Sequence, residues 1–209
     1  MRYAPAAGRP CRLVVLISGT GSNLAALLDA CTDPAYGATV VAVGADRESA
    51  GGLKLASDAG VATFVDRVKE YPTRDAWDLA LTEHVAEHGP DLVISAGFLK
   101  LVGPVFLDRF EGRYINTHNT LLPAFPGMDG PREALEYGVK ITGATLFFVD
   151  AGMDSGPILA QAAVPVHQDD DVETLTERIK VAERAQLVEC VGRLARDGWT
   201  LSGRRVTIP

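Results

Sequence analysis

The stretch R-L-V-V-L-I-S-G-T-G-S-N-L, from Arg12 to Leu24, decides the fold. Its first part, 12–17, is a short apolar run, which is typical of a strand covered on both faces. The glycine-rich turn that follows leads directly into A-A-L-L-D-A, which has the composition of a helix. A buried strand, a glycine turn and a helix in this order predict the first unit of an α/β fold.

Further along the chain, apolar strands alternate with helices in the same way. We expect strands at 39–45, 61–65, 91–98 and 113–118, with helices between them. This alternation predicts β-α-β units and a Rossmann-like, mostly parallel twisted sheet with helices on both faces. Two later runs, G-A-T-L-F-F-V and P-I-L-A-Q-A-A-V-P-V, can pair directly, and Asp171 opens a long amphipathic C-terminal helix.

The whole chain limits the class of protein. Its 209 residues, 47% hydrophobic and 22% charged, fit a single α/β domain, which we place at 12–209 after a flexible N-terminal tail at 1–11. The apolar runs are too short to span a bilayer, and we expect no signal peptide. A net charge of −7 argues against nucleic acid as a partner. Three isolated cysteines fit a reducing cytoplasm and predict neither a disulfide framework nor a zinc site.

The glycine turn at 18–24 is the first candidate site. Glycines let the backbone turn tightly, and free N–H groups at a helix N-terminus bind an anion. The spacing matches neither the dinucleotide fingerprint nor the P-loop. A plain turn with Ser22 or Asn23 as the helix cap explains the pattern about as well. The position at the carboxyl end of the first strand favours a phosphate-binding loop.

Asn116 and His118 form the second candidate site, at the end of the strand at 113–118. Residues two apart on a strand point the same way, so both side chains can converge on one atom. An amide N–H and a protonated imidazole are the groups that stabilise an oxyanion when an acyl carbonyl is attacked. A lone histidine is more often structural, but its pairing with an asparagine at this end of a parallel strand favours a function.

The third candidate is D-A-G-M-D-S-G-P-I, at 150–158. Asp154 lies between two glycines, where the backbone can approach a ligand closely. A carboxylate beside His118 would orient the imidazole and favour its charged form. A tight Asp-Gly turn is the structural alternative, and it accounts for Asp150.

Together, V-L-I-S-G-T-G-S-N-L, the strand-borne N-x-H before L-L-P-x-F-P-G, and V-D-A-G-x-D-x-G-P-I-L-A-Q resemble the phosphoribosylglycinamide formyltransferase family, over about 12–209. That family transfers a formyl group from 10-formyltetrahydrofolate to the primary amine of glycinamide ribonucleotide in purine biosynthesis. The resemblance implies a cytoplasmic, folate-dependent transferase with small-molecule partners and no metal. It implies no nucleic-acid or membrane partner and leaves a homodimer open.

The resemblance also assigns roles position by position. Asn116 and His118 would stabilise the tetrahedral oxyanion, and Asp154 would set the charge of His118 and help to move the proton of the amine. Lys180 matches a phosphate contact, and Glu183, three residues on, matches a contact to the ribose hydroxyls. The full set expected at the ribonucleotide is Gly19, Thr20, Gly21, Ser22, Asn23, Lys180 and Glu183. The set expected at the folate is Arg74, Phe98, Leu99, Lys100, Leu101, Val102, Asp150, Ala151 and Gly152.

Three positions near the expected reaction centre depart from the family pattern. Asn119 stands where the family has Pro, and Asp129 and Phe147 stand where it has His. If Asp129 lies beside Asp154, the two carboxylates favour protonation of one of them, which would hold His118 less firmly in its charged form.

Four interpretations therefore stay open. The first, which we favour, is an ordinary formyltransferase of purine synthesis. The second is a diverged formyltransferase that acts on a different, phosphoribosyl-like amine in a specialised pathway. The third is a non-catalytic ribonucleotide-binding protein. The fourth, which needs no resemblance, is an anion-binding Rossmann-like domain with an unrelated activity.

Overall fold

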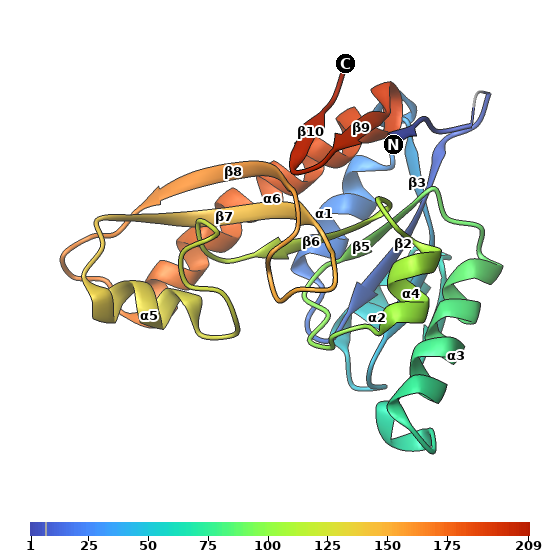
Figure 1. The fold of residues 1–209 in the computed structure, drawn as a ribbon, viewed down its shortest axis with the longest axis horizontal. Helices are drawn as coiled ribbons and strands as arrows, with labels where there is room; N and C mark the ends of the chain where they lie inside the picture. The colour runs from blue at the N-terminus through green and yellow to red at the C-terminus, as the bar shows by residue number, and fades with distance from the viewer. Residues whose placement is uncertain (7) are drawn as a thin grey trace.

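The computed structural model describes residues 1–6 and 8–209, and its centre is a seven-stranded sheet of order β4-β3-β2-β5-β6-β7-β8 (Figure 1). The strands are β2 (Cys11–Ile17), β3 (Ala38–Ala45), β4 (Ala62–Val65), β5 (Leu92–Ser95), β6 (Tyr114–His118), β7 (Ile141–Phe148) and β8 (Ile158–Pro165). Neighbours from β4 to β6 are parallel, whereas β7 runs antiparallel to both β6 and β8. The predicted mostly parallel sheet and the direct pairing of the two later runs are confirmed.

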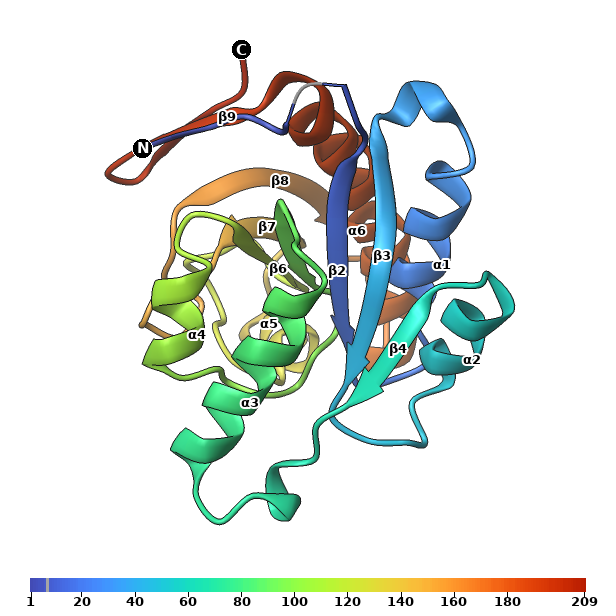
Figure 2. The same cartoon turned by 90° about the vertical axis from the view of Figure 1, so that its right-hand side faces the viewer.

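Helices cover both faces of the parallel part of the sheet. The described helices are α1 (Ser22–Ala30), α2 (Gly51–Asp58), α3 (Arg74–Glu87), α4 (Pro104–Arg109), α5 (Gly130–Tyr137) and α6 (Val172–Asp197), with short 3-10 turns η1 (Pro34–Tyr36) and η2 (Val68–Glu70), and α5 lies away from the parallel part. Figure 2 shows α1 and α2 on one side of β2, β3 and β4, and α3 on the other side. The strands β7 and β8, with α5 and part of α6, extend to the left in Figure 1.

The first apolar run is buried on both faces because it is the central strand β2. Leu13, Val15 and Ile17 pack in the cluster that contains residues of α1, α2 and α6. Val14 and Leu16 pack in the opposite cluster, with residues of α3 and α4. All five side chains are fully buried. Because strand side chains alternate between the two faces of the sheet, this one apolar run contributes to the hydrophobic core on each face.

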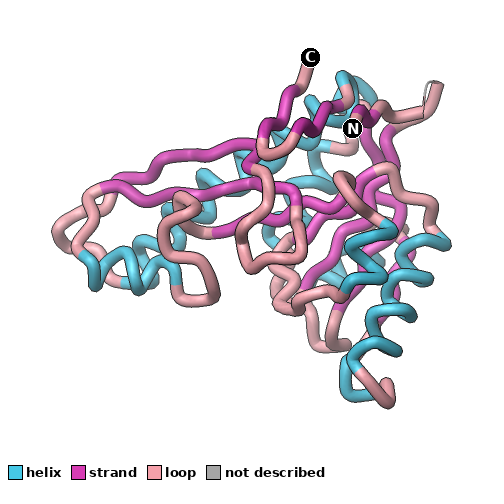
Figure 3. Tube along the Cα trace, viewed as in Figure 1, coloured by secondary structure: helices cyan, strands magenta, loops and turns pink. Residues whose placement is uncertain are grey.

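The strand order places a topological switch point at the carboxyl end of β2. From β2 the chain moves to β3 and β4 on one side, and then crosses to β5 and β6 on the other side. Open α/β sheets bind ligands at such a switch point, because the loops diverge there. The run predicted as a strand at 91–98 ends at Ser95, since Gly97 has a φ of +81° and turns the chain away from the sheet. Figure 3 shows the loops that follow β5, β6 and β7.

The helix α6 connects the two halves of the sheet and starts where the sequence predicted. Asp171 caps it in a capping box with Thr174. Its first turns pack through Leu175 and Ile179 near β7 and β8, and its later turns pack in the cluster of β2 and β3. The middle of α6 therefore lies near the start of α1, where Glu183 accepts a hydrogen bond from Asn23. Among the described residues, no helix has the length and apolar character of a membrane span.

The two ends of the chain meet in a small sheet of order β1-β9-β10. Its strands are β1 (Arg2–Tyr3), β9 (Trp199–Ser202) and β10 (Arg205–Thr207). Tyr3 stacks on the buried Trp199, with ring centroids 5.3 Å apart. Part of the segment predicted as a flexible tail, 1–11, thus pairs with the C-terminal hairpin, while Ala7 lies outside the described residues. The division into a tail and a domain at 12–209 stays a prediction.

Candidate active site

His118 lies at the end of β6 and is enclosed by two loops. Its side chain is 6% exposed, and its Nε2 lies 2.9 Å from the carbonyl oxygen of Phe125. A carbonyl oxygen only accepts, so Nε2 carries a proton and donates it. The Nδ1 atom faces Asp154 Oδ2 at 3.7 Å. This Nδ1–Oδ2 separation is longer than a hydrogen bond, which leaves room for a third group beside both atoms.

Asp154 connects the loop after β7 to the loop after β6. Its Oδ2 accepts the backbone N–H of Gly127 at 2.8 Å, and its side chain is 14% exposed. Asp154 has a φ of +49° and Phe125 has a φ of +53°, a region that costs energy for residues other than glycine. Within the described part of the chain these are the non-glycine residues with positive φ, and both contact His118. The backbone strain is therefore concentrated around this imidazole.

Asn116 shares a face of β6 with His118, as expected from their spacing. It is half-buried and lies opposite Phe147 of β7, which is 1% exposed. The amide thus has an apolar neighbour where the family pattern has a histidine. Of the other departures, Asn119 is half-buried and Asp129 is exposed at the start of α5, with no hydrogen bond from its side chain to the helix end.

A second buried contact joins the glycine turn to α6. Asn23 Nδ2 donates to Glu183 Oε1 at 2.6 Å, across 160 positions of sequence. Burial raises the pKa of the Glu183 carboxyl above its ordinary value, and hydrogen bonds from Asn23 and Thr117 oppose that rise. Thr117 comes from β6, so Glu183 lies next to the strand that carries His118. Asn23 Oδ1 is buried without a hydrogen-bond partner among the described residues. Lys180 lies one turn earlier on α6, is 44% exposed and pairs with Glu177 at 2.6 Å.

The glycine turn begins α1 with a backbone that few residues adopt. Gly21 is the N-cap and has a φ of +82°, and a Cβ built there would lie 2.7 Å from Gly52 Cα. At Gly19, no atom lies within 4 Å of a built Cβ, and φ is not positive. Gly19, Thr20 and Ser22 surround this bend at the carboxyl end of β2, and Thr20 and Ser22 are exposed. The close packing of the turn therefore depends on one glycine rather than two.

We predict that Gly21→Ala destabilises the protein and that Gly19→Ala does not. A side chain in the left-handed region, pressed against rigid backbone, costs about 2 kcal/mol or more. Gly19→Ala should change the free energy of unfolding by less than about 0.5 kcal/mol. Urea denaturation followed by the fluorescence of the buried Trp77 and Trp199 measures both changes. Equal destabilisation by the two substitutions would contradict the assignment of the bend to Gly21.

The loop expected to line the folate pocket follows β5. Phe98 is buried and lies near Trp77, whereas Leu99 and Leu101 are 51% and 68% exposed. Arg74 packs over the Trp77 ring, 4.2 Å from its centroid, and donates to the Leu101 carbonyl oxygen. Val102 is half-buried at the end of the loop. The loop therefore has two exposed apolar side chains, and Arg74 fixes its backbone through the Leu101 carbonyl oxygen.

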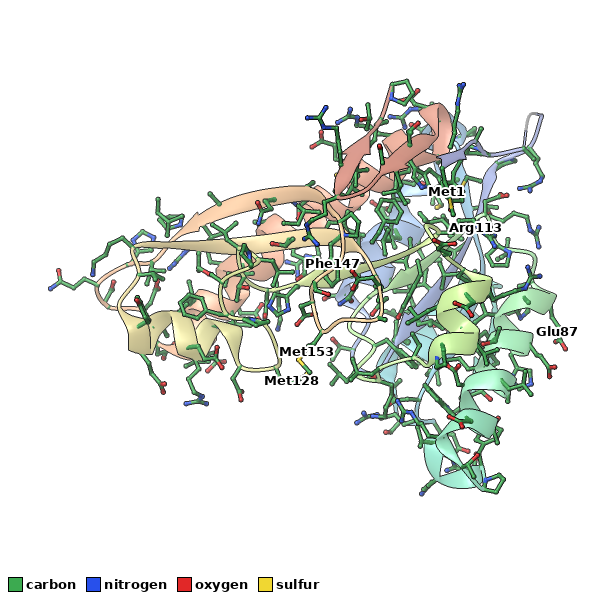
Figure 4. The ribbon with its side chains drawn as sticks, viewed as in Figure 1. Met1, Glu87, Arg113, Met128, Phe147 and Met153 are labelled. Carbon is green, nitrogen blue, oxygen red and sulfur yellow. The ribbon has the colours of Figure 1, made fainter. Side chains whose placement is uncertain are left out.

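The loop after β7 is held by its own side chains. Asp150 Oδ1 accepts the Gly152 N–H at 3.0 Å and the Ser155 hydroxyl at 2.7 Å, as the tight-turn alternative expects. Ala151 and Gly152 are exposed. Figure 4 labels Met153, which is exposed on this loop, and Met128, which is exposed on the facing loop beside the Gly127–Asp154 contact.

The structure adds groups that the sequence did not suggest. The Phe125 carbonyl oxygen contacts His118, and Thr117 hydrogen-bonds to Glu183. Neither contact could be predicted, because a backbone carbonyl and a threonine in a strand have no distinctive sequence motif. Asp46, directly after β3, accepts a hydrogen bond from Lys100 of the loop after β5. A polar residue at the carboxyl end of a parallel strand was the signal that could have found it.

The described residues contain no group of three or more His, Cys, Asp or Glu arranged to hold a metal ion. The site instead consists of an imidazole between a carbonyl and a carboxylate, an amide two positions before it, and a buried Asn–Glu pair. Such an arrangement can stabilise a negative oxygen and move a proton, and it adjoins a glycine turn that suits an anion.

Comparison with known proteins agrees with this chemistry. A formyl transferase family model matches residues 11–191. A phosphoribosylglycinamide formyltransferase of Mycobacterium tuberculosis (strain H37Rv) is 56% identical over 208 residues, covering 100% of this chain and 95% of the relative. The Escherichia coli (strain K12) protein of that name is 39% identical over 173 residues, covering 83% and 82%.

The solved structure of glycinamide ribonucleotide transformylase 1 from Symbiobacterium toebii superposes with a TM-score of 0.93 at 45% identity, covering 96% of this chain and 95% of that one. Phosphoribosylglycinamide formyltransferase from Coxiella burnetii, solved in complex with CHES, gives a TM-score of 0.90 at 30% identity, covering 96% and 94%. The chain belongs to the phosphoribosylglycinamide formyltransferase family.

Proposed function

We propose that this protein transfers the formyl group of 10-formyltetrahydrofolate to the primary amine of glycinamide ribonucleotide, in purine biosynthesis. The names of its relatives support the reaction. The observation that carries the proposal is His118, held between the Phe125 carbonyl and Asp154 at the end of β6. That position suits a group that must stay charged while an oxyanion forms beside it.

In the proposed mechanism the amine nitrogen attacks the formyl carbon and a tetrahedral intermediate forms. The Asn116 amide and the His118 imidazolium stabilise its oxyanion. Asp154, directly or through water, takes the proton that the amine loses. As the new carbon–nitrogen bond is completed, the bond from the formyl carbon to N10 of the folate breaks, and the proton passes to N10. Atoms and charges balance without a metal.

The substrates occupy opposite sides of this centre in the proposal. The ribonucleotide phosphate lies on the turn of Gly19, Thr20, Gly21, Ser22 and Asn23, where backbone N–H groups begin α1. Glu183 accepts hydrogen bonds from the ribose hydroxyls. Lys180 leaves its ion pair with Glu177 and binds the phosphate instead. The folate lies along Leu99, Leu101 and the loop of Asp150, Ala151 and Gly152. Small anionic substrates of this kind fit a cytoplasmic enzyme, and a homodimer stays a prediction.

We predict that Lys180→Ala raises the KM for glycinamide ribonucleotide about tenfold or more, with kcat nearly unchanged, because a charge-assisted hydrogen bond to phosphate is lost. Lys54→Ala is the matched control, since Lys54 is also an exposed helical lysine paired with a carboxylate on its own helix. The effect should vanish for a substrate without the phosphate. An equal effect with and without phosphate would contradict the contact.

A second candidate function is formylation of a different amine. It is favoured by the position of Phe147, buried opposite Asn116 where the family pattern has an imidazole. The test of both is tetrahydrofolate release from 10-formyltetrahydrofolate, measured by absorbance with glycinamide ribonucleotide as acceptor. Turnover of about 1 per second or faster supports the first function. Ribonucleotide binding without turnover would reject it and move the search to other acceptor amines.

A further inference from the structure

A buried carboxylate outside the proposed chemistry lies at the same edge of the sheet. Asp46 follows β3 directly, and its side chain is 1% exposed. Its Oδ2 accepts from Lys100 Nζ at 2.8 Å, and both oxygens accept from Arg47, at 2.8 and 3.0 Å. The hydroxyl of Ser18 is its third partner. Cations from two segments and a hydroxyl from a third therefore converge on one carboxylate.

The same group of contacts holds two substrate loops together. Ser18 Oγ, which donates to Asp46, accepts the Leu99 N–H at 2.9 Å. The Ser18 N–H donates to the Gly97 carbonyl oxygen at 3.1 Å. Ser18 begins the turn proposed for the phosphate, and Lys100 lies in the loop proposed for the folate. The Asp46 carboxylate is thus the common anchor of both.

The charge of Asp46 is maintained despite its burial. Burial raises the pKa of this carboxyl, but hydrogen bonds from Arg47, Lys100 and Ser18 outweigh it, so that the pKa falls to about 2. The carboxylate is ionised at neutral pH and needs its cations. A buried charge that loses its partner is strongly disfavoured. Moving the Lys100 ammonium away from Asp46 would therefore cost free energy. Its exposed fraction, 29%, agrees with a partly enclosed ion pair.

We propose that Asp46 is a positioning residue that holds Lys100 as its counter-ion and thereby fixes the folate loop against the phosphate turn. Lys100 then acts inside the protein and does not bind a carboxylate of the folate. Its backbone and the neighbouring Leu99 and Leu101 face the co-substrate. The assignment of folate to this loop rests on the proposed function, whereas the anchoring of the loop does not.

The test compares Lys100→Met with Arg47→Met. Both remove one cation from the same carboxylate, but only Lys100 ties a distant loop to it, since Arg47 is the neighbour of Asp46 in sequence. Hydrogen exchange of the segment 97–102 should be faster in Lys100→Met and unchanged in Arg47→Met. Folate-analogue binding, by titration calorimetry, should weaken about tenfold or more in Lys100→Met and less than about threefold in Arg47→Met. Equal effects of the two variants would overturn the proposal.

Two further measurements separate anchoring from direct binding. An analogue without the glutamate tail should lose as much affinity in Lys100→Met as the complete folate does. A loss confined to ligands with the tail would show that Lys100 binds the tail and would overturn the proposal. Asp46→Asn combined with Lys100→Met should weaken binding less than the product of the two single effects, because no unpaired buried charge is left. Independent effects would also overturn it.

The failure of this inference can be told from the failure of the proposed function. A parent protein that binds no folate analogue defeats the proposed function, while the hydrogen-exchange comparison still decides whether Lys100 anchors the loop. A parent that binds the analogue, with variants that exchange and bind alike, defeats the anchoring alone.

Discussion

Replacing His118 with Asn is expected to lower kcat for formyl transfer by about 10²- to 10³-fold, the usual cost of losing one group that stabilises an oxyanion. His118 donates from Nε2 to the Phe125 carbonyl oxygen and faces the Asp154 carboxylate with Nδ1, an arrangement in which the proposed mechanism uses the charged imidazolium. An asparagine of similar reach keeps a hydrogen-bond donor but removes that charge. The initial rate of tetrahydrofolate release at saturating substrates measures the effect.

The matched control is His167→Asn, because His167 is exposed and lies outside the site, before the start of α6. It should leave kcat within about twofold of the parent. Ribonucleotide binding by titration calorimetry should be retained in His118→Asn, which separates lost chemistry from lost structure. A His118→Asn variant that turns over within a few-fold of the parent would remove His118 from the mechanism.

Short apolar runs and the alternation of strands with helices predicted most of the fold. The run at 12–17 is apolar throughout because β2 is central and covered on both faces, which leaves a strong signal. The end of β5 was less visible, because the positive φ of Gly97 ends it inside an apolar run. The pairing of Arg2–Tyr3 with β9 was invisible, since two residues carry no period and their partner is near the other end of the chain.

The sequence predicted only part of the site, because some of its contacts join residues that are far apart in the chain. Asn116 and His118 share one strand, so their convergence follows from local geometry. The contact of Asn23 with Glu183 joins residues far apart in sequence, and only the resemblance linked both to one ligand. Lys100 shows the limit most clearly, because a loop lysine is normally a solvated charge, and its partner Asp46 is identified only by the folded sheet.

Two of the departures from the family pattern, Phe147 and Asp129, lie in different surroundings, so we expect them to affect the reaction centre to different extents. Phe147 is buried opposite Asn116 and replaces a polar group next to the proposed oxyanion. Asp129 is exposed, where water and salt screen its charge. Asp154 contacts His118 and the Gly127 N–H. The contacts of the Asp154 carboxylate are thus with His118 and a backbone N–H, and we expect Asp129 to affect its charge weakly.

Replacing Asp154 with Asn is expected to lower kcat by about 10²-fold, which corresponds to about 2.7 kcal/mol of barrier. An asparagine oxygen still accepts the Gly127 N–H, so the link between the two loops survives. What disappears is the negative charge opposite His118 Nδ1 and the acceptor for the proton of the amine. The kcat of the variant and its KM for the ribonucleotide, which should be nearly unchanged, measure this loss.

Asp129→Asn is the matched control, because it removes the same charge from the facing loop. An exposed, screened carboxylate should change kcat by less than about threefold. If Asp129→Asn instead raised kcat tenfold, Asp129 would be suppressing the charge of His118, as two interacting carboxylates predict. If it lowered kcat as much as Asp154→Asn, the role assigned to Asp154 would be shared between the two loops, and the mechanism proposed for proton transfer would be wrong.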